Sequence, residues 1–401
     1  MVERAFVERL ARETEQWVAD GVITAEQAAV LRARYDSPGV VAGDAAEEPR
    51  SRAANALAVI GAIAVGFGVI GFFAANWEEM SHALRLTLIT LSIAAAYAGG
   101  YHLRERTARL PRVGEALYLL GVILFGSALF LVGQMFNVEA HDPLALLLWA
   151  IGAVAVAVIV RSRSIAWAAL LIFTGWIGFE GGTALEDSGN DVSGLAVLSV
   201  LYGSALYALG TAALERVRAD WLTETGFAEA ARRLGLLIGA AGVFVFTFSE
   251  AAEGLESGEL EGLLFAGMFV FAGLALAGAV ALGLGDRRSG RYEAAAVVVA
   301  VAFTLLAIFA GGNGDLYALF FNLLFAAVAL GAIYAGYVGE EPWLVNAGVA
   351  LVAIDLIARY FDVFWSALPR SVGMIGAGVL ILAIAYLLER QRKHLLARMD
   401  A

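Results

Sequence analysis

Cysteine is absent from the 401 residues, and lysine occurs once, at Lys393. The first absence excludes disulfides, thiol nucleophiles and thiolate-bound metals. Charged residues make up only 16% of the chain, whereas ordinary soluble domains have about 25%. The sequence has no Walker-type glycine loop and no basic stripe with interleaved aromatics. We therefore expect neither ATP hydrolysis within this chain nor nucleic-acid binding.

Apolar residues are instead abundant. They make up 60% of the chain, and the mean hydropathy is +0.76. They gather in runs of roughly 20 residues, the length of helix that crosses a bilayer. The first 50 residues are polar, and no signal peptide is visible. This pattern predicts an all-α, polytopic transmembrane helical bundle. The net charge of −11 with so little lysine is typical of salt-loving prokaryotes.

Twelve apolar spans follow one another from residue 54 onward. They cover residues 54–75, 84–103, 113–134, 143–160, 164–180, 195–214, 231–249, 262–284, 293–311, 316–338, 342–361 and 369–389. Arginine falls almost wholly in alternate connecting segments, and the predicted outer loops carry Arg370 alone. The positive-inside rule then places both termini in the cytoplasm of a cell-membrane protein. The one predicted inner loop without a basic residue is that around Glu340.

The outer loops are acidic, as in "EAAEGLESGELEG" at residues 250–262. Acidic residues contribute little to topology, so this bias has another cause. Solubility in strong salt and attraction of cations toward a pore are both open explanations.

Four segments organise the chain. Residues 1–35 predict a small cytoplasmic helical hairpin, in which Gly21 ends the first helix and Thr24 with Gln27 forms a capping box for the second. Residues 36–53 read as a flexible linker, 54–389 as the transmembrane domain and 390–401 as a basic cytoplasmic tail. Two short helices bury little surface, so we expect the hairpin to pair with another copy or with a partner.

A weak internal repeat suggests two six-span halves. The segment from Asp142 can be laid on the segment from Asp315, an offset of six spans. An even offset keeps the orientation of each span, so the halves would be parallel, as in some transporters.

Polar side chains inside or beside the spans are the candidate site residues, because they are costly in hydrocarbon. Seven such residues fall in the predicted outer half or at the outer interface: Asn313 and the six candidates Asn76, Gln134, Asn137, Asn322, Asp355 and Arg359. The inner half is nearly devoid of such residues. This asymmetry suggests a polar cleft that opens outward, although polar span ends alone account for several of the six.

Two pairs among these residues each have two interpretations. Asp355 and Arg359 are spaced i, i+4 and can neutralise each other on one helix face. They are either a structural pair or a proton, cation or anionic-headgroup site. Gln134 and Asn137 follow small residues at the end of the third span. They either bond to a neighbouring helix or contact a ligand.

An enzyme is the weaker interpretation. His82 and His141 lie near acidic residues in predicted outer loops, but they lack the spacing of a zinc site. We expect no catalytic residue, no metal and no cofactor.

Several stretches resemble a known family. They are "DGVITAEQAAVLRARY" (20–35), "GFFAANWEEMSHALRL" (71–86), "FGSALFLVGQMFNVEAHDPLALLLWAIGA" (125–153) and "ARYFDVFWSALPRS" (358–371). They are similar to uncharacterised prokaryotic membrane proteins with domain of unknown function 2157. The resemblance implies a multi-span membrane protein and supplies neither a substrate nor catalytic residues.

Two functions follow from these observations. The first is secondary transport or translocation of a small solute or lipid through the outward polar cleft. The alternative is a membrane sensor or scaffold that oligomerises or recruits a partner through the cytoplasmic hairpin.

Overall fold

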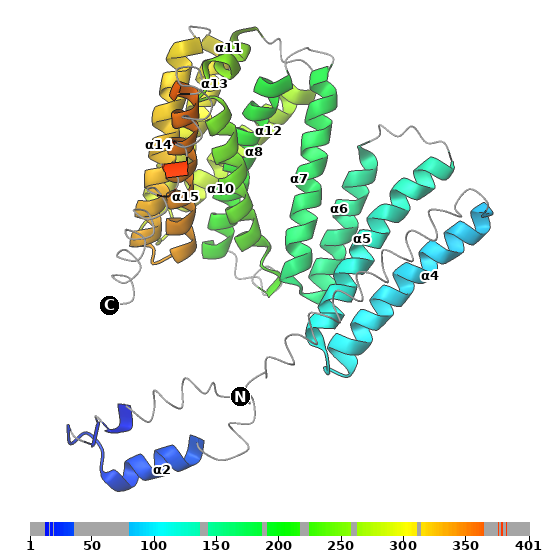
Figure 1. Ribbon diagram of the computed structural model, residues 1–401, viewed down its shortest axis with the longest axis vertical. Coiled ribbons are helices and arrows are strands. Elements are labelled where there is room, and N and C mark those ends of the chain that lie inside the picture. Colours follow the sequence, from blue (N-terminus) through cyan, green and yellow to red (C-terminus); the bar gives the residue numbers. More distant parts are fainter. Residues whose placement is uncertain are drawn as a thin grey trace. The chain divides into compact units, whose positions relative to one another are not determined.

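The computed structural model describes most of the central part of the chain. The described residues are 13–35 without 16 and 19, 80–136, 143–186, 191–216, 224–257, 263–310, 314–364, and the single positions 376, 378, 379 and 382. Every regular element in these residues is a helix (Figure 1). The all-α prediction is confirmed.

The N-terminal hairpin keeps its predicted turn. Gly21 has a φ of +72°, a conformation that favours glycine. Helix α2 (Ala25–Tyr35) begins after Thr24. The Gln27 amide N–H donates to Thr24 Oγ1 at 3.2 Å, and the Thr24 N–H donates to Gln27 Oε1 at 2.9 Å. The capping box is therefore confirmed.

Long helices follow from residue 82. They are α4 (His82–Tyr101), α5 (Pro111–Met135), α6 (Leu144–Val160), α7 (Arg163–Glu186), α8 (Asp191–Arg216), α10 (Phe227–Val245), α12 (Leu263–Gly283), α13 (Gly290–Ala310), α14 (Gly314–Val338) and α15 (Pro342–Phe364), with the short π-helix η1 (His102–Arg106) after α4 and the short α11 (Ser249–Ser257) after α10. In this part of the chain, eight helices are long and apolar enough to cross a membrane. They are the long ones except α6 and α10. The protein is thus a multi-span membrane protein.

The twelve expected spans correspond to these helices only in part. The first lies outside the described residues, and the last lies outside them apart from four single positions. The range 143–160 corresponds to α6, a shorter apolar helix. The range 231–249 is not one helix, because α10 ends at Val245 and α11 begins at Ser249.

Glycines hold α8 and α10 at close range. A Cβ at Gly210 of α8 would lie 2.6 Å from the Arg232 nitrogen, and one at Gly242 of α10 would lie 2.7 Å from the Val200 nitrogen. At Gly235, an added Cβ would meet the backbone of Tyr207. Such contacts leave no room for a side chain, and small residues at helix interfaces let backbones approach in this way. The close approach places Arg232 beside Tyr207.

Apolar packing forms two large described cores and a small third one, which joins Ala332 and Ala335 of α14 to Leu344 of α15. The larger joins α8, α10, α12, α13 and α14 around Phe246, Phe321 and Phe325, which are at most 1% exposed. The second large core joins α5, α6 and α7. In it, Trp149 Nε1 donates to the Val122 carbonyl at 2.8 Å, and the Trp149 ring packs on Gly126. The Trp149 ring thus fills the space where a side chain at position 126 would lie.

Candidate functional site

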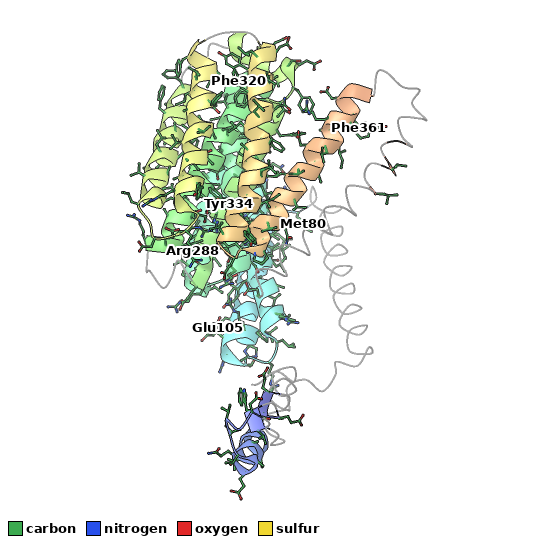
Figure 2. The ribbon with its side chains drawn as sticks, turned by 90° about the vertical axis from the view of Figure 1, so that its left-hand side faces the viewer. Met80, Glu105, Arg288, Phe320, Tyr334 and Phe361 are labelled. Atoms are coloured by element: carbon green, nitrogen blue, oxygen red, sulfur yellow. The ribbon has the colours of Figure 1, made fainter. Side chains whose placement is uncertain are left out.

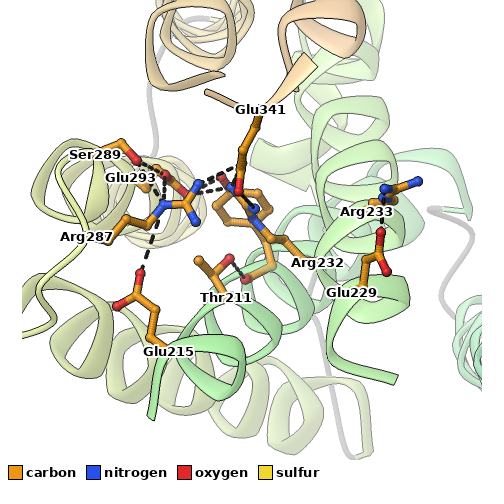
Figure 3. Close-up of polar contacts among 10 residues, drawn as sticks. Thr211, Glu215, Glu229, Arg232, Arg233, Arg287, Ser289, Glu293 and Glu341 are labelled. Carbon is orange, nitrogen blue, oxygen red and sulfur yellow. Dashed lines mark hydrogen bonds and ion pairs between the residues drawn. The ribbon is translucent and has the colours of Figure 1, made fainter. Parts of the chain in front are cut away.

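Charged and polar side chains from three helices and two interhelical turns meet at the end of the bundle where α8 and α14 finish (Figure 3). We call them the charged cluster, defined as Tyr207 of α8, Arg232 of α10, Arg287 and Ser289 of the turn before α13, Glu293 of α13, and Glu341 of the turn before α15. The cluster therefore joins two interhelical turns to the starts of α10 and α13.

Arg232 is the central cation, and its side chain is 3% exposed. Its Nη1 donates to Glu341 Oε1 at 2.8 Å, and its Nη2 lies 2.7 Å from Glu341 Oε2. The guanidinium also lies 5.6 Å from the Tyr207 ring centroid and 5.0 Å from that of Trp343. A planar fork held by a carboxylate and by aromatic rings suits arginine and not lysine.

Glu293 is the central anion, and its side chain is also 3% exposed. Its Oε1 accepts hydrogen bonds from Ser289 at 2.6 Å and Arg287 Nε at 2.9 Å. Its Oε2 accepts from the Tyr207 hydroxyl at 2.5 Å and Arg232 Nη2 at 3.3 Å. A carboxylate has about four acceptor positions. All of them are filled, so the Glu293 carboxylate is held in place by four donors.

Arg287 and Glu341 complete the network outside the helices. Arg287 Nη2 lies 2.7 Å from Glu341 Oε2, and Arg287 Nε lies 4.0 Å from Glu215 Oε1. Burial tends to raise the pKa of the Glu341 carboxyl, but the hydrogen bonds and charges of Arg232 and Arg287 outweigh it and lower that pKa. Two guanidinium groups thus face the three carboxylates of Glu215, Glu293 and Glu341.

A faint signal for this cluster is present in the sequence, but the prediction overlooked it. The expectation that the predicted inner half is nearly devoid of buried polar groups is wrong, because Arg232 and Glu293 are buried within α10 and α13. The signal is the single predicted inner loop without a basic residue. That loop supplies Glu341, which pairs with Arg232 of α10 and with Arg287 of the turn before α13.

An apolar cavity of about 240 Å³ adjoins the cluster. Tyr207 and Glu293 form its polar end. The remaining lining comes mostly from small and apolar residues of α8, α10, α13 and α14, among them Gly203, Gly239, Ala296, Val297 and Gly331. Several of its rim residues on α13 and α14 are exposed.

A second polar site lies at the opposite end of α10. There the chain leaves the helix, and residues 246–248 connect α10 to α11. Thr247, 2% exposed, is the centre of the site. Asn322 Nδ2 of α14 donates to the Thr247 carbonyl at 2.9 Å, and Arg359 Nη2 of α15 donates to Thr247 Oγ1 at 2.7 Å. We call Thr247, Asn322, Asp355 and Arg359 the Thr247 site.

Asp355 belongs to this site through Arg359. Asp355 Oδ1 lies 3.7 Å from Arg359 Nε, so the predicted i, i+4 pair forms. Arg359 Nη1 also donates to Asp362 at 3.0 Å, and its guanidinium covers the Phe248 ring at 4.6 Å. Within the described part of the chain, Asp355 Oδ1 and Arg359 Nε are buried without a hydrogen-bond partner. Buried polar atoms without a hydrogen bond are uncommon in folded proteins.

The site thus unites three of the six predicted residues. Asn322, Asp355 and Arg359 meet around Thr247, which the sequence did not single out. Gln134 lies exposed at the last turn of α5. Asn76 and Asn137 lie outside the described residues. Among the residues that the structure describes, no group of three or more acidic or histidine side chains could hold a metal.

Comparison with known proteins gives a family and no activity. Residues 15–166 match the family described as "Predicted membrane protein (DUF2157)", so the expected resemblance is confirmed over these residues. Nothing among curated proteins and nothing among solved structures matches the chain.

Proposed function

We propose that this protein is a secondary transporter or translocator that moves a small amphiphile, and that it performs no chemical step. The observation that carries the proposal is the position of two features along one helix. The Thr247 site directly follows the end of α10, and the apolar cavity lies against the same helix from Gly235 to Val243. Interrupted helices in the membrane are found where they line a cavity or a binding site.

The depth of the interruption supports this proposal. Asn322 lies eight residues beyond Gly314, the first residue of α14. At 1.5 Å per residue this is about 12 Å along the helix axis. Irregular backbone at that depth needs polar partners, which Asn322 and Arg359 supply. Asp355 Oδ1 and Arg359 Nε pair with each other at 3.7 Å but form no hydrogen bond. A polar group of the substrate would bind at these atoms.

The sequence left two substrate classes open, a small solute and a lipid. The cavity favours the lipid, because its lining is mostly apolar and its exposed rim belongs to two helices apolar enough to span the membrane. A polar solute would gain little from such a lining.

We also propose the orientation derived from the sequence, with twelve spans in the cell membrane and both termini cytoplasmic. Support comes from the alternation of arginine in the loops. It also comes from the ten expected spans that overlap described helices. In this orientation the charged cluster faces the cytoplasm and the Thr247 site lies in the outer half.

A translocation assay tests the function. The purified protein is reconstituted in liposomes with a fluorescent phospholipid, and the rate at which the probe changes leaflet is measured. We expect Asp355→Asn to slow this rate about 10- to 100-fold, equivalent to one charged hydrogen bond of about 1.5–3 kcal/mol. Glu250→Gln, a change at an exposed acid of α11, serves as the matched control and keeps the rate. Equal rates in all three proteins would contradict the proposal.

A sensor or scaffold is the second candidate, and the hairpin favours it. Val22 and Val30 are 70% and 69% exposed there. Such apolar side chains on a small hairpin suit pairing with a second copy or a cytoplasmic partner. Deleting residues 1–50 separates the candidates. If the protein is a transporter, translocation survives the deletion. If it is a scaffold, the deletion abolishes oligomers, and Asp355→Asn leaves the translocation rate unchanged.

A further inference from the structure

Two hollows follow one another between the facing ends of α13 and α14. The first is the apolar cavity of about 240 Å³ described above. The second, of about 280 Å³, is lined by Arg287, Arg288, Val338, Gly339 and Glu340. Figure 2 shows Arg288 and Tyr334 at the same end of these helices, with Phe320 at the other. A molecule with an apolar part and a polar part could therefore occupy both hollows.

The apolar cavity is accessible from the side of the bundle. Its rim includes Tyr292 and Tyr334, which are 60% and 51% exposed, and their rings are 5.6 Å apart at 89°. Gly331 on the rim is exposed, and a Cβ added there meets nothing within 4 Å. Exposed positions on membrane-spanning helices face lipid or another helix. A hydrocarbon chain could thus enter between α13 and α14 without crossing the charged cluster.

The size of the cavity suits part of a hydrocarbon chain. An engineered apolar cavity of about 150 Å³ is known to hold benzene. The cavity here is larger, at about 240 Å³, and is lined mostly by apolar atoms. Tyrosines at its rim are typical of the level of lipid headgroups, where an apolar ring and a polar hydroxyl are both accommodated.

The second hollow carries positive charge, which attracts a phosphate. Arg287 is bound to Glu293 and Glu341 and is not available. Arg288 is exposed and, within the described residues, has neither an ion pair nor a hydrogen-bond partner. Glu340 is its acidic neighbour in the hollow, which disfavours ligands with several negative charges. A single phosphodiester, bonded by the guanidinium fork of Arg288, fits this balance.

We propose that the seam between α13 and α14 is a phospholipid-binding site. One hydrocarbon chain lies in the apolar cavity, the tyrosine pair flanks the glycerol region, and the phosphodiester binds Arg288. This inference rests on the proposed function, because it gives the translocated amphiphile a chemical class and a point of entry.

Lipid binding by the full-length protein tests the site. The protein is delipidated in mild detergent and titrated with phosphatidylglycerol, and bound lipid is counted by native mass spectrometry. We expect Gly331→Leu, which fills the cavity, and Arg288→Ser, which removes the cation, each to weaken binding roughly tenfold. The matched controls are Gly273→Leu on α12, where an added Cβ also meets nothing within 4 Å, and Arg109→Ser. Both controls should bind as the unchanged protein does.

Two further measurements keep the outcome decisive. Ala327→Leu, at another exposed rim position, should weaken binding even if Gly331→Leu does not fold. Neutral diacylglycerol should bind at least roughly tenfold more weakly than phosphatidylglycerol, since it lacks the group that Arg288 bonds. Unchanged binding in Gly331→Leu, Ala327→Leu and Arg288→Ser, or equal binding of diacylglycerol, would overturn the site.

The two proposals fail in different ways. Specific lipid binding that is lost in these variants, without any translocation in liposomes, supports the site and contradicts the function. Translocation that proceeds while the variants bind lipid as the unchanged protein does contradicts the site alone.

Discussion

Arg232 and Glu341 form a forked pair across the bundle, with Nη1 and Nη2 of Arg232 lying 2.8 and 2.7 Å from the two carboxylate oxygens of Glu341. The residues are 109 positions apart in sequence. The pair fixes the start of α10 to the turn between α14 and α15. Because Arg287 joins the same carboxylate, the turn before α13 is fixed as well.

The forked pair predicts unequal roles for two adjacent arginines. Arg232→Met should lower the free energy of unfolding by about 3–5 kcal/mol, since removing one partner leaves buried carboxylates without their cation. Arg233→Met should cost about 0.5 kcal/mol or less, because its pair with Glu229 is 38% and 40% exposed. Both guanidinium groups contact Trp343, so that contact is lost in either variant. Unfolding in detergent measures the difference, and equal losses would contradict the assignment.

The charged cluster also predicts a dependence on pH. The pKa of Glu341 is lower in the folded protein than its ordinary value, because the hydrogen bonds and charges of Arg232 and Arg287 outweigh burial. Its contribution to stability is therefore complete above the unfolded pKa of about 4.3 and is lost as the pH falls through the folded pKa. The stability difference between the unchanged protein and Glu341→Gln should be constant near neutral pH and shrink in acid. A stability difference that grows as the pH falls would contradict the lowered pKa of Glu341.

The contact between α8 and α10 predicts strict size limits at its glycines. In Gly235→Ala the new Cβ meets backbone atoms of α8, which cannot rotate away as a side chain can. Overpacking of this kind costs about 1–3 kcal/mol. Gly273→Ala, with open space around the new Cβ, should be neutral or slightly stabilising. Melting temperatures of the two variants in one detergent give the test, and a neutral Gly235→Ala would refute the close approach.

The absence of cysteine makes the orientation directly measurable. Single cysteines at exposed Glu250 and Glu340 give two reporters in an otherwise thiol-free protein. An impermeant maleimide added to intact cells should label Glu250→Cys, and it should label Glu340→Cys only after permeabilisation. The reverse pattern would invert the topology, and equal labelling of both would reject an odd number of crossings between these two positions.

The local features of the fold could be predicted from the sequence. The capping box of Thr24 and Gln27 involves neighbours three residues apart, and the pair of Asp355 and Arg359 involves neighbours on one helix face. Helix lengths were also close to expectation, because a membrane span is recognised by the length of its apolar run.

The contacts between distant elements were not predictable in the same way. Arg232 lies at the start of the expected span 231–249, and Glu341 lies in the expected loop around Glu340. Their pairing depends on how α10 and α15 pack, which no local pattern encodes. Thr247 was missed because a threonine in an apolar run is unremarkable until a helix ends beside it. The break between α10 and α11 has neither proline nor glycine at residues 246–248, the usual signals of interruption.

The most direct test of the account closes the mouth of the cavity in the working protein. Tyr292→Cys and Tyr334→Cys, combined in the thiol-free chain, place two thiols at positions whose rings now touch. A short bifunctional thiosulfonate should link them and can be removed by reductant. We expect translocation of the fluorescent phospholipid in liposomes to stop on linking and to return on reduction, while each single variant stays active. Translocation at the same rate with α13 and α14 linked would contradict this expectation.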